Sequence, residues 1–457
     1  MTNNIRIDQE VCVGCGMCSR ACPVGAIEGE PRQPYKIIDD KCIHCGQCIQ
    51  ACNVQLRNND LRAQKLEERG MLPNATEPLF AAYQMNQVQV VKEAVDSKKY
   101  FNVVHCAPSV RVGIAEEFGM PAGTLAPGKM FAALRRLGFD RVYDTNFGAD
   151  ITIMEEAAEF LDRVTHPGAH GPLPMTTSCC PGWVKYIEAE HPDLIPHLSS
   201  CKSPVGMISP LIKTYGAAQN GVDPASIYTT IIMPCTAKAF EVERPEMNAS
   251  GFQDTDAVLT TRELAQWIKA EGIDFMNLPD EEVDQLLGEY TGAGNIFGAS
   301  GGVMEAALRT AYETVTGKDL PRLEFDEVRG GEGIRKATVQ MGDKTVRVAV
   351  VAGLQHVNEA LEQIRNGTAD FDFMEVMACP NGCISGGGQP KLPPAPAAKK
   401  AALEARTANM YAHDKNLPLR KCHENPMIKK VYAEFLGEPL GEKSHELLHT
   451  HFYSRKK

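Results

Sequence analysis

The sequence lacks an excess of positive charge, a long hydrophobic run and an export signal. Its 457 residues carry 58 Asp and Glu against 47 Lys and Arg, a formal net charge of -11. This balance argues against a general nucleic-acid binder, which usually presents a basic face. No run of about 18 apolar residues occurs, so no membrane span is expected. The first residues hold neither an apolar signal core nor a twin-arginine motif, and the cytoplasm is therefore the expected compartment.

Residues 1–60 also have few side chains that could build a hydrophobic core, and Tyr35 is their one residue of the Phe, Trp and Tyr group. A unit of this composition needs another source of stability, which bound metal can supply. Eight of the 16 cysteines of the chain fall within its first 52 residues. Because disulfides are disfavoured in the cytoplasm, such a cluster favours metal binding.

Two cysteine motifs, offset by 30 residues, fill this unit. The first has the spacing C-x2-C-x2-C-x3-C-P, and the second repeats it with Asn53 in place of the proline. In bacterial two-cluster ferredoxins with this spacing, each motif gives three thiolates to one [4Fe-4S] cluster and its fourth to the other. A pair of zinc sites is the alternative, but zinc favours two separated C-x2-C pairs. We expect one cluster on Cys12, Cys15, Cys18 and Cys52, and the other on Cys22, Cys42, Cys45 and Cys48.

Beyond this unit, the polar-rich residues 61–98 predict a helical connector, and residues 99–392 predict a large α/β domain. The apolar runs 101–110, 226–235 and 346–353 are typical of buried strands. Thr260 and Glu263 have the spacing of a capping box at the start of a helix. The alternation of such elements predicts mixed or parallel sheets, joined to an α+β ferredoxin-like domain at residues 1–60.

Residues 393–457 are expected to form a linker and a helical tail. The sequence KLPPAPAAKK at 391–400 is typical of an extended linker. The segment 391–430 is locally basic, which is most simply a solvated surface wrap. Helical spacing further on predicts a helix with one face packed on the main body. That face comprises Ile428, Val431, Tyr432, Phe435 and Leu436.

Three further cysteine motifs lie far apart in the large domain: TSCCPGW at 177–183, MPCTAKAFE at 233–241 and EVMACPNGCISGGGQP at 375–390. Two adjacent cysteines cannot easily both point into one cluster, so one of the first pair is left free. A C-x3-C pair can place two sulfurs on one helix turn, and the glycines after it let the backbone approach a bulky cofactor. The motifs therefore offer four thiolates to a third cubane: Cys180, Cys235, Cys379 and Cys383.

These three segments resemble the signature motifs of [FeFe]-hydrogenases, and the resemblance covers nearly the whole chain. The chain is similar to the two-cluster type with a ferredoxin-like N-terminal domain. Residues 425–452 are similar to the separate small subunit of the periplasmic enzymes of sulfate reducers, here fused to the chain. The resemblance implies reversible reduction of protons to H2 at an H-cluster. That cofactor is a [4Fe-4S] cubane joined to a di-iron unit with CO, cyanide and an azadithiolate bridge.

The resemblance also implies a role for each motif residue. Cys180, Cys235 and Cys379 would hold the cubane, and Cys383 would bridge to the di-iron unit. Cys179 would be a free thiol that exchanges protons with the bridging amine. Lys238 would donate a hydrogen bond to one cyanide ligand. The other cyanide would be lined by Ala107, Pro108 and Ser109. An apolar wall that excludes water would be formed by Met233, Pro234, Phe297 and Met377.

A proton route from Cys179 to solvent is implied as well. The family pattern carries it onto Glu159, Ser199 and Glu156, with Arg163 at the outer end. Glu156 and Glu159 are three residues apart and so share one helix face. Without the resemblance, a solvated helix face would be the simpler interpretation.

The remaining cysteines and two other features are expected to be structural. Free cysteine packs as a small hydrophobic residue, which predicts unreactive buried thiols at three positions. The histidines of ELLHTH at 446–451 have zinc-like spacing but no evident partner set, and we expect them at the surface. Trp183 is expected to pack rather than to catalyse. The three thiols are Cys106, Cys201 and Cys422.

The resemblance implies that electrons come from a ferredoxin, from another redox protein or from a partner subunit, for example in a complex with a formate dehydrogenase. Maturation proteins would insert the di-iron unit. Two other functions stay open. An H2-sensing regulator usually has an added regulatory domain and an altered Cys179-type position, and a hydrogenase-like iron–sulfur assembly factor lacks the di-iron unit and the complete relay. The intact motifs favour the enzyme.

Overall fold

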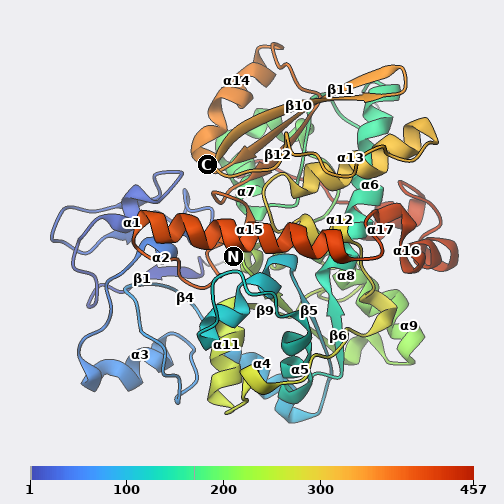
Figure 1. Ribbon diagram of the computed structural model, residues 1–457. Helices are drawn as coiled ribbons and strands as arrows, with labels where there is room; N and C mark the ends of the chain where they lie inside the picture. The colour runs from blue at the N-terminus through green and yellow to red at the C-terminus, as the bar shows by residue number, and fades with distance from the viewer. Residues whose placement is uncertain (1–2, 169, 457) are drawn as a thin grey trace.

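Two sheets at the centre of the large domain position the candidate site. A computed structural model describes residues 3–168 and 170–456. Figure 1 shows the N-terminal unit (blue) at one side of the large domain. The long tail helix α15, Pro396–Asn416, crosses the front of the molecule in this view. Among the described residues, no helix combines the length and the apolar character that a membrane span requires.

The N-terminal unit is built from two short helices and two small sheets. Helix α1, Met17–Arg20, and helix α2, Gln47–Ala51, each carry the third cysteine of one motif, and the fourth follows the helix. β2, Ile27–Glu28, pairs with β3, Lys36–Ile37. β1, Ile5–Ile7, pairs with β4, Ala82–Gln84. The predicted helical connector is therefore wrong at residues 82–84, which extend to complete a sheet, although α3 (Arg62–Glu68) and α4 (Val88–Ser97) are helices.

The first large sheet is entirely parallel, in the order β6-β5-β8-β9. The predicted strands at 101–110 and 226–235 contain β5, Phe101–Cys106, and β8, Ile227–Met233. Their buried β-branched residues suit a strand covered on both faces. β9, Ala257–Thr260, leads into α11, Thr261–Ala270, and the predicted capping box of Thr260 and Glu263 is present. The sheet is completed by β6 (Arg141–Asp144), and α5 (Pro127–Leu137) precedes that strand.

The second large sheet is mixed, in the order β10-β11-β12-β7. β10, Gly333–Met341, and β11, Lys344–Ala352, form an antiparallel hairpin, and β11 contains most of the strand predicted at 346–353. β12, Phe373–Met377, and β7, Met175–Thr176, continue the sheet in parallel. The predicted class is confirmed: a ferredoxin-like domain, an α/β domain with mixed and parallel sheets, and a helical C-terminal wrap. Further helices are α7 (Pro181–Glu190), α9 (Ala217–Asn220), α12 (Gly292–Ile296), α13 (Gly302–Thr316) and α14 (Asn358–Arg365).

Helix α6, Thr145–Thr165, passes through the large domain and is buried along most of its length. It begins directly after β6, where the Asp144 carboxylate caps it by accepting a hydrogen bond from the Asn146 N–H at 2.9 Å. It packs against α8, Pro204–Leu211, and against α13. A helix surrounded in this way can bring polar side chains to a protein interior.

Within the described residues, the α-helices of the tail are α15, α16 (Pro426–Val431) and α17 (Glu442–Leu448). The linker predicted at 391–400 is extended only to Ala395. Pro396 starts α15, because proline is tolerated at the first helical position and the alanine-rich sequence after it favours helix. The predicted packed face is present: Ile428, Val431, Tyr432 and Leu436 are buried, with Phe435 half-buried.

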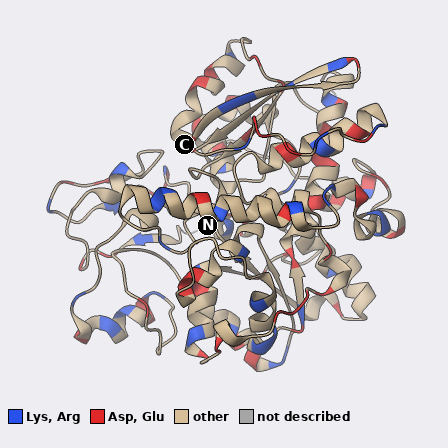
Figure 2. Ribbon diagram, in the orientation of Figure 1, with Lys and Arg blue, Asp and Glu red and all other residues tan. Residues whose placement is uncertain are grey.

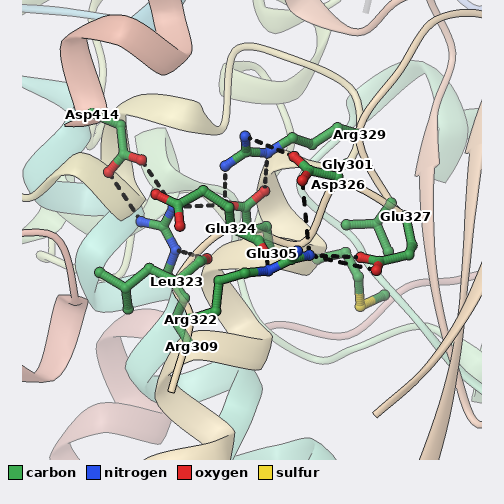
Figure 3. A network of polar contacts seen from close by, with 12 residues as sticks. Gly301, Glu305, Arg309, Arg322, Leu323, Glu324, Asp326, Glu327, Arg329 and Asp414 are labelled. Atoms are coloured by element: carbon green, nitrogen blue, oxygen red, sulfur yellow. Dashed lines mark hydrogen bonds and ion pairs between the residues drawn. The ribbon is translucent and has the colours of Figure 1, made fainter. Parts of the chain in front are cut away.

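Buried ion pairs hold α15 against the large domain. Arg406 is fully buried and donates to both oxygens of Glu116 at 2.7 and 2.6 Å. Figure 3 shows Asp414 and Glu305 around Arg309, whose guanidinium donates to Asp414 at 3.0 and 2.9 Å and to Glu305 at 2.6 Å. The prediction that the basic segment 391–430 is simply solvated is wrong at Arg406. Figure 2 shows acidic and basic residues mixed along the chain in this view.

Candidate active site

The eight N-terminal cysteines lie in two groups that line two separate cavities. Gly14, Gly16 and Gly46 have φ values of 70°, 70° and 71°. This left-handed backbone, which suits glycine, lets successive sulfurs converge before each helix. Each motif delivers its last cysteine to the cavity of the other, which is the grouping that the spacing predicts. One cavity is lined by Cys12, Cys15, Cys18 and Cys52, the other by Cys22, Cys42, Cys45 and Cys48.

The chemistry of these donor sets fits iron–sulfur clusters. Burial raises the pKa of Cys18 to about 11 and raises the pKa of Cys48 well above its ordinary value. Several thiolates in an apolar cavity require a cation to compensate their charge, and a coordinating metal deprotonates a thiol outright.

The second cysteine motif touches the large domain directly. The Thr236 hydroxyl donates to the His44 carbonyl oxygen at 2.6 Å, and the Gln47 amide donates to the Ser385 carbonyl oxygen at 3.0 Å. Gly387 packs so tightly that an added Cβ would lie 2.5 Å from the Cys45 carbonyl oxygen. The second ferredoxin-type cavity therefore borders the segments that carry the large-domain cysteines.

Those large-domain cysteines meet where parallel strands of both sheets end. Cys180 follows β7 and precedes α7, Cys235 follows β8, and Cys379 follows β12. Carboxyl ends of parallel strands are where α/β proteins commonly bind ligands. Here they surround one cavity of about 80 Å³. Five cysteines line it: Cys179, Cys180, Cys235, Cys379 and Cys383.

The thiols of this cavity have raised pKa values, as do Cys18 and Cys48 of the N-terminal unit. Burial raises the pKa of Cys235 to about 12 and raises the pKa values of the other four cysteines. Gly386 comes so close to the Pro234 carbonyl that an added Cβ would lie 2.3 Å from its oxygen. The cavity thus combines a group of five thiols with a close backbone contact that only glycine can make. This combination fits a bulky metal cofactor.

The wall of the cavity is mostly apolar. Its lining includes all seven pocket residues that the resemblance implies, namely Ala107, Pro108, Ser109, Met233, Pro234, Phe297 and Met377. Four other lining residues lie outside the cysteine motifs and were therefore not predicted. The one available signal was the position of Thr145, at the start of a helix that directly follows a strand. The four are Thr145, Pro204, Val205 and Gly298.

Lys238 brings a positive charge to this wall. It is 7% exposed, and its ammonium donates to the Glu241 carboxylate and, at 2.7 Å, to the Ser203 hydroxyl. Burial lowers the pKa of Lys238, but the Glu241 charge and hydrogen bond outweigh it, so the pKa stands above its ordinary value. Lys238 is therefore charged at neutral pH. Glu241 was not predicted, although it lies three residues further on the same helix.

The residues of the predicted relay lie together on and beside α6. Glu156 and Glu159 are 0% exposed and Arg163 is 2% exposed, so the alternative of a solvated helix face is wrong. The Ser199 hydroxyl donates to Glu159 Oε2 at 2.8 Å. Arg163 Nη2 donates to Glu159 Oε1 at 2.6 Å. Glu159 thus holds its place through a hydroxyl on one side and a guanidinium on the other.

Glu156 differs from Glu159 in having no hydrogen bond of ordinary geometry to either carboxylate oxygen among the described residues, although the Ser199 hydroxyl and the Ser178 N–H lie close enough to lower its pKa. Burial, and after it the charge of Glu159, raises the pKa of Glu156 to about 8. Burial and the charge of Glu156 raise the pKa of Cys179 in turn. The charge of Glu156 therefore interacts with both Glu159 and Cys179, and Glu156 can hold or release a proton near neutral pH.

Two residues expected to be structural lie next to the relay. Cys201 is buried, but its thiol donates to Glu159 Oε2 at 3.6 Å, so it touches the relay. His449 is 8% exposed, which contradicts the surface position predicted for it, whereas His451 is exposed. The apolar Leu447 and Leu448 beside His449 pack into the core and take it inside. The other structural predictions agree with burial: Cys106, Cys422 and Trp183 are each 0% exposed.

Three family models match the chain. The model described as "Iron only hydrogenase large subunit, C-terminal domain" matches residues 100–387, and "Iron hydrogenase small subunit" matches residues 400–455. The model "4Fe-4S dicluster domain" matches residues 11–56.

Individual proteins agree with these matches. The NADP-reducing hydrogenase subunit HndD of Solidesulfovibrio fructosivorans is 47% identical over 83% of this chain and 65% of its own length. The periplasmic [Fe] hydrogenase large subunit of Nitratidesulfovibrio vulgaris is 45% identical over 89% of this chain and 90% of its own. A solved [FeFe]-hydrogenase from Chlamydomonas reinhardtii has a TM-score of 0.72 and 41% identity, covering 81% of this chain and 100% of that one. A cytosolic Fe-S cluster assembly factor of Danio rerio is more distant, at 28% identity over 80% of this chain and 89% of its own.

Proposed function

This chain belongs to the [FeFe]-hydrogenase family, and from that premise we propose that it reversibly combines two protons and two electrons into H2. The observation that carries the proposal is a single cavity lined by five cysteines and Lys238, beside a buried carboxylate relay. An iron–sulfur assembly factor has no use for a proton relay. The buried Glu156 and the hydrogen-bonded group of Ser199, Glu159 and Arg163 therefore favour the enzyme.

The cavity residues fit an H-cluster, whose metal centre supplies the redox chemistry of the H–H bond when it is bound. Cys180, Cys235 and Cys379 would hold its cubane, and Cys383 would join the cubane to the di-iron unit. Lys238 is a charged donor for a cyanide ligand, because Glu241 keeps it protonated. The wall of Pro108, Met233, Phe297 and their neighbours keeps bulk water out and so strengthens each polar contact inside.

Proton movement is the task of the protein side chains. The Cys179 thiol lies at the cavity and gives or takes a proton there. Glu156, with its pKa of about 8, exchanges that proton with Cys179. The Ser199 hydroxyl passes it on to Glu159, which it already contacts, and Arg163 stabilises Glu159 when it is ionised. Each of these side chains passes the proton to the next one by rotating about its own bonds or by exchanging a proton across a hydrogen bond.

Electrons would reach this cavity through the N-terminal unit. The contact of His44, Gln47 and Gly46 with residues 236 and 385–387 supports this route, because it sets the second ferredoxin-type cavity against the large-domain cysteines. A ferredoxin, another redox protein or a partner subunit such as that of a formate dehydrogenase would supply the electrons. Maturation proteins would insert the di-iron unit, and the cytoplasm is the proposed compartment.

The test is H2 evolution with reduced methyl viologen, on protein produced anaerobically together with its maturation proteins. We expect robust activity in the wild type. Cys179→Ala should lose at least about a hundred-fold, because it removes the acid–base group at the cavity. A wild type that holds iron for three cubanes and a di-iron unit yet makes no H2 would contradict the enzyme and favour a sensing or assembly role.

A further inference from the structure

A row of histidines connects the protein surface to the interior of the tail. His166 and His170 share the carboxylate of Asp162, with N···O distances of 2.8 and 3.2 Å, and their side chains are 71% and 33% exposed. The His170 ring stacks on His445 with the ring centroids 5.9 Å apart. The centroid of the His445 ring lies 4.3 Å from that of the His449 ring. At these centroid separations the neighbouring rings are in or near van der Waals contact, and a water molecule at their edges can join their nitrogens.

The inner end of this row reaches the relay. His449 Nδ1 lies 2.8 Å from the Ser200 hydroxyl oxygen. The Ser200 backbone N–H donates to both oxygens of Glu159, at 3.1 and 3.0 Å. A ring nitrogen of His449 and a carboxylate oxygen of Glu159 lie within 4.8 Å of each other. One hydroxyl group can span that separation.

The tail holds His449 firmly in this position. The backbone of Cys201 pairs with that of His449. Lys202 donates to the Leu448 carbonyl from its backbone at 2.9 Å and to the Leu447 carbonyl from its ammonium at 2.8 Å. The fused segment that resembles a small subunit therefore contributes side chains beside α6, and does more than cover it.

The charged and titratable groups around His449 define its chemistry. Glu155 Oε2 lies 3.0 Å from His449 Nε2. Burial raises the pKa of Glu155, but hydrogen bonds from His449, Tyr432 and the Leu440 N–H outweigh it and hold that pKa below its ordinary value. An ionised Glu155 accepts a hydrogen bond from the His449 Nε2–H, and Nδ1 then faces Ser200. The other groups that face this ring are Glu159, Cys201 and His445, with Arg163 behind Glu159.

The donor atoms of Glu159, Cys201 and His449 could in principle hold a metal ion, since they lie within 4.8 Å of one another. The neighbouring charge speaks against it. Arg163 places a fixed positive charge 2.6 Å from the Glu159 carboxylate. Burial also raises the pKa of Cys201, which keeps it a thiol. The surroundings suit a group that carries protons better than a divalent cation.

We propose that this histidine row is a second proton entrance to the relay, supplied by the C-terminal tail. The His449 imidazolium gives its Nδ1 proton to the Ser200 oxygen, and the Ser200 hydroxyl gives its own proton to the Glu159 carboxylate. His449 is left neutral, and solvent protons recharge it through His170 and His445. The inference rests on the proposed function, because H2 formation consumes the protons that enter.

The first test is chemical rescue in the maturated enzyme. We expect His449→Ala to lower the rate of H2 evolution by about ten-fold or more, with the larger loss at alkaline pH, where protons are scarce. Added imidazole should restore most of that rate. His451→Ala, an exposed histidine outside the row, should keep the wild-type rate. Activity of His449→Ala equal to the wild type, or a loss that imidazole does not rescue, would overturn the proposal.

A second readout does not depend on turnover. Infrared pH titration of the carboxyl C=O bands, on the full chain produced without maturation proteins, follows the protonation of Glu156 and Glu159. His449→Gln should shift the titration midpoint, and His451→Gln should leave it in place. An unchanged midpoint in His449→Gln would contradict the coupling. If the maturated wild type makes no H2, the proposed function fails, whereas the infrared shift still reports on the histidine row.

Discussion

At the scale of single residues, Glu156 is the clearest case of a side chain held in an unfavourable environment. It is 0% exposed, and neither of its oxygens has a hydrogen bond of ordinary geometry among the described residues. Its pKa of about 8 stands above the ordinary 4.5 because of burial and the charge of Glu159. Between these two pH values the folded chain binds a proton that the unfolded chain has released. Stability must therefore fall as the pH rises through this window.

We predict that Glu156→Gln separates activity from stability. The amide keeps the shape but cannot exchange a proton, so H2 evolution should fall by about a hundred-fold or more. The free energy of unfolding of the variant, measured in urea, should exceed that of the wild type at pH values above about 8. The difference should shrink as the pH is lowered toward 4.5.

The matched control is Glu190→Gln, which changes an exposed glutamate. It should leave both the rate and the pH dependence of unfolding at wild-type values. A Glu156→Gln variant whose stability follows the wild type at every pH would show that Glu156 is not held neutral in the folded chain.

At the scale of elements, α15 shows how ion pairs fix the tail. Asp414 is 1% exposed and accepts from Arg309 at 3.0 and 2.9 Å and from Arg420 at 3.2 and 2.8 Å. Burial raises the pKa of Asp414, but the two arginines outweigh it and keep the pKa below 3.8. A carboxyl group with a lowered pKa stabilises the fold above its ordinary value and loses that contribution as the pH falls.

We predict that Asp414→Asn lowers the free energy of unfolding at neutral pH by about 3 kcal/mol, because it leaves a buried guanidinium without its full counter-charge. The difference from the wild type should diminish under acidic conditions. Urea unfolding at the two pH values measures both effects. Asp343→Asn, in the exposed turn between β10 and β11, is the control and should change stability by less than about 0.5 kcal/mol. Equal stability of the wild type and Asp414→Asn at neutral pH would contradict this account of the tail.

Elements differed in how far the sequence predicted them. The strands β5 and β8 were predictable because buried parallel strands are uninterrupted apolar runs. The burial of α6 was not predictable from the sequence. Glu156, Glu159 and Arg163 by themselves are typical of a solvent-facing helix surface, and they are enclosed by the neighbouring helices and the tail. The start of α15 was not predictable from its prolines, which are typical of a linker, although the alanines after them favour a helix. The burial of His449 was not predictable either, because it depends on a tail whose backbone pairs with that of Cys201.

At the scale of the whole molecule, the cysteine spacing predicted which sulfurs could form a group, but not how the groups lie relative to one another. That arrangement depends on contacts between segments some 340 residues apart, such as Gln50 with Gly386 and Gln389, at separations of 336 and 339 residues. No local pattern encodes such pairs. Short strands and tight glycine turns on both sides bring the N-terminal unit against the cavity.

The junction between the N-terminal unit and the large domain gives the last prediction. Gly387 lies against Cys45 and Gly46, and an added Cβ would come within 2.5 Å of a backbone oxygen and 2.6 Å of a backbone carbon. Backbone atoms cannot yield as a flexible side chain can, so Gly387→Ala must push the two parts of the chain apart. Electron transfer through the N-terminal unit should then slow, and H2 evolution with a reduced ferredoxin as donor should fall by about ten-fold or more, since small misplacements can carry such costs.

Gly216→Ala is the matched control, because Gly216 has a helical φ of -63° and an added Cβ would lie 3.2 Å from Leu211 O and Leu287 Cδ1. A shift of a few tenths of an ångström relieves that contact, whereas the 2.5 Å approach at Gly387 needs a larger displacement of backbone. It should keep the wild-type rate. Iron analysis distinguishes slow electron transfer from lost clusters: Gly387→Ala should retain iron and still slow down. Full activity in Gly387→Ala would mean that electrons reach the cavity without the close contact at Cys45, and that this contact serves stability alone.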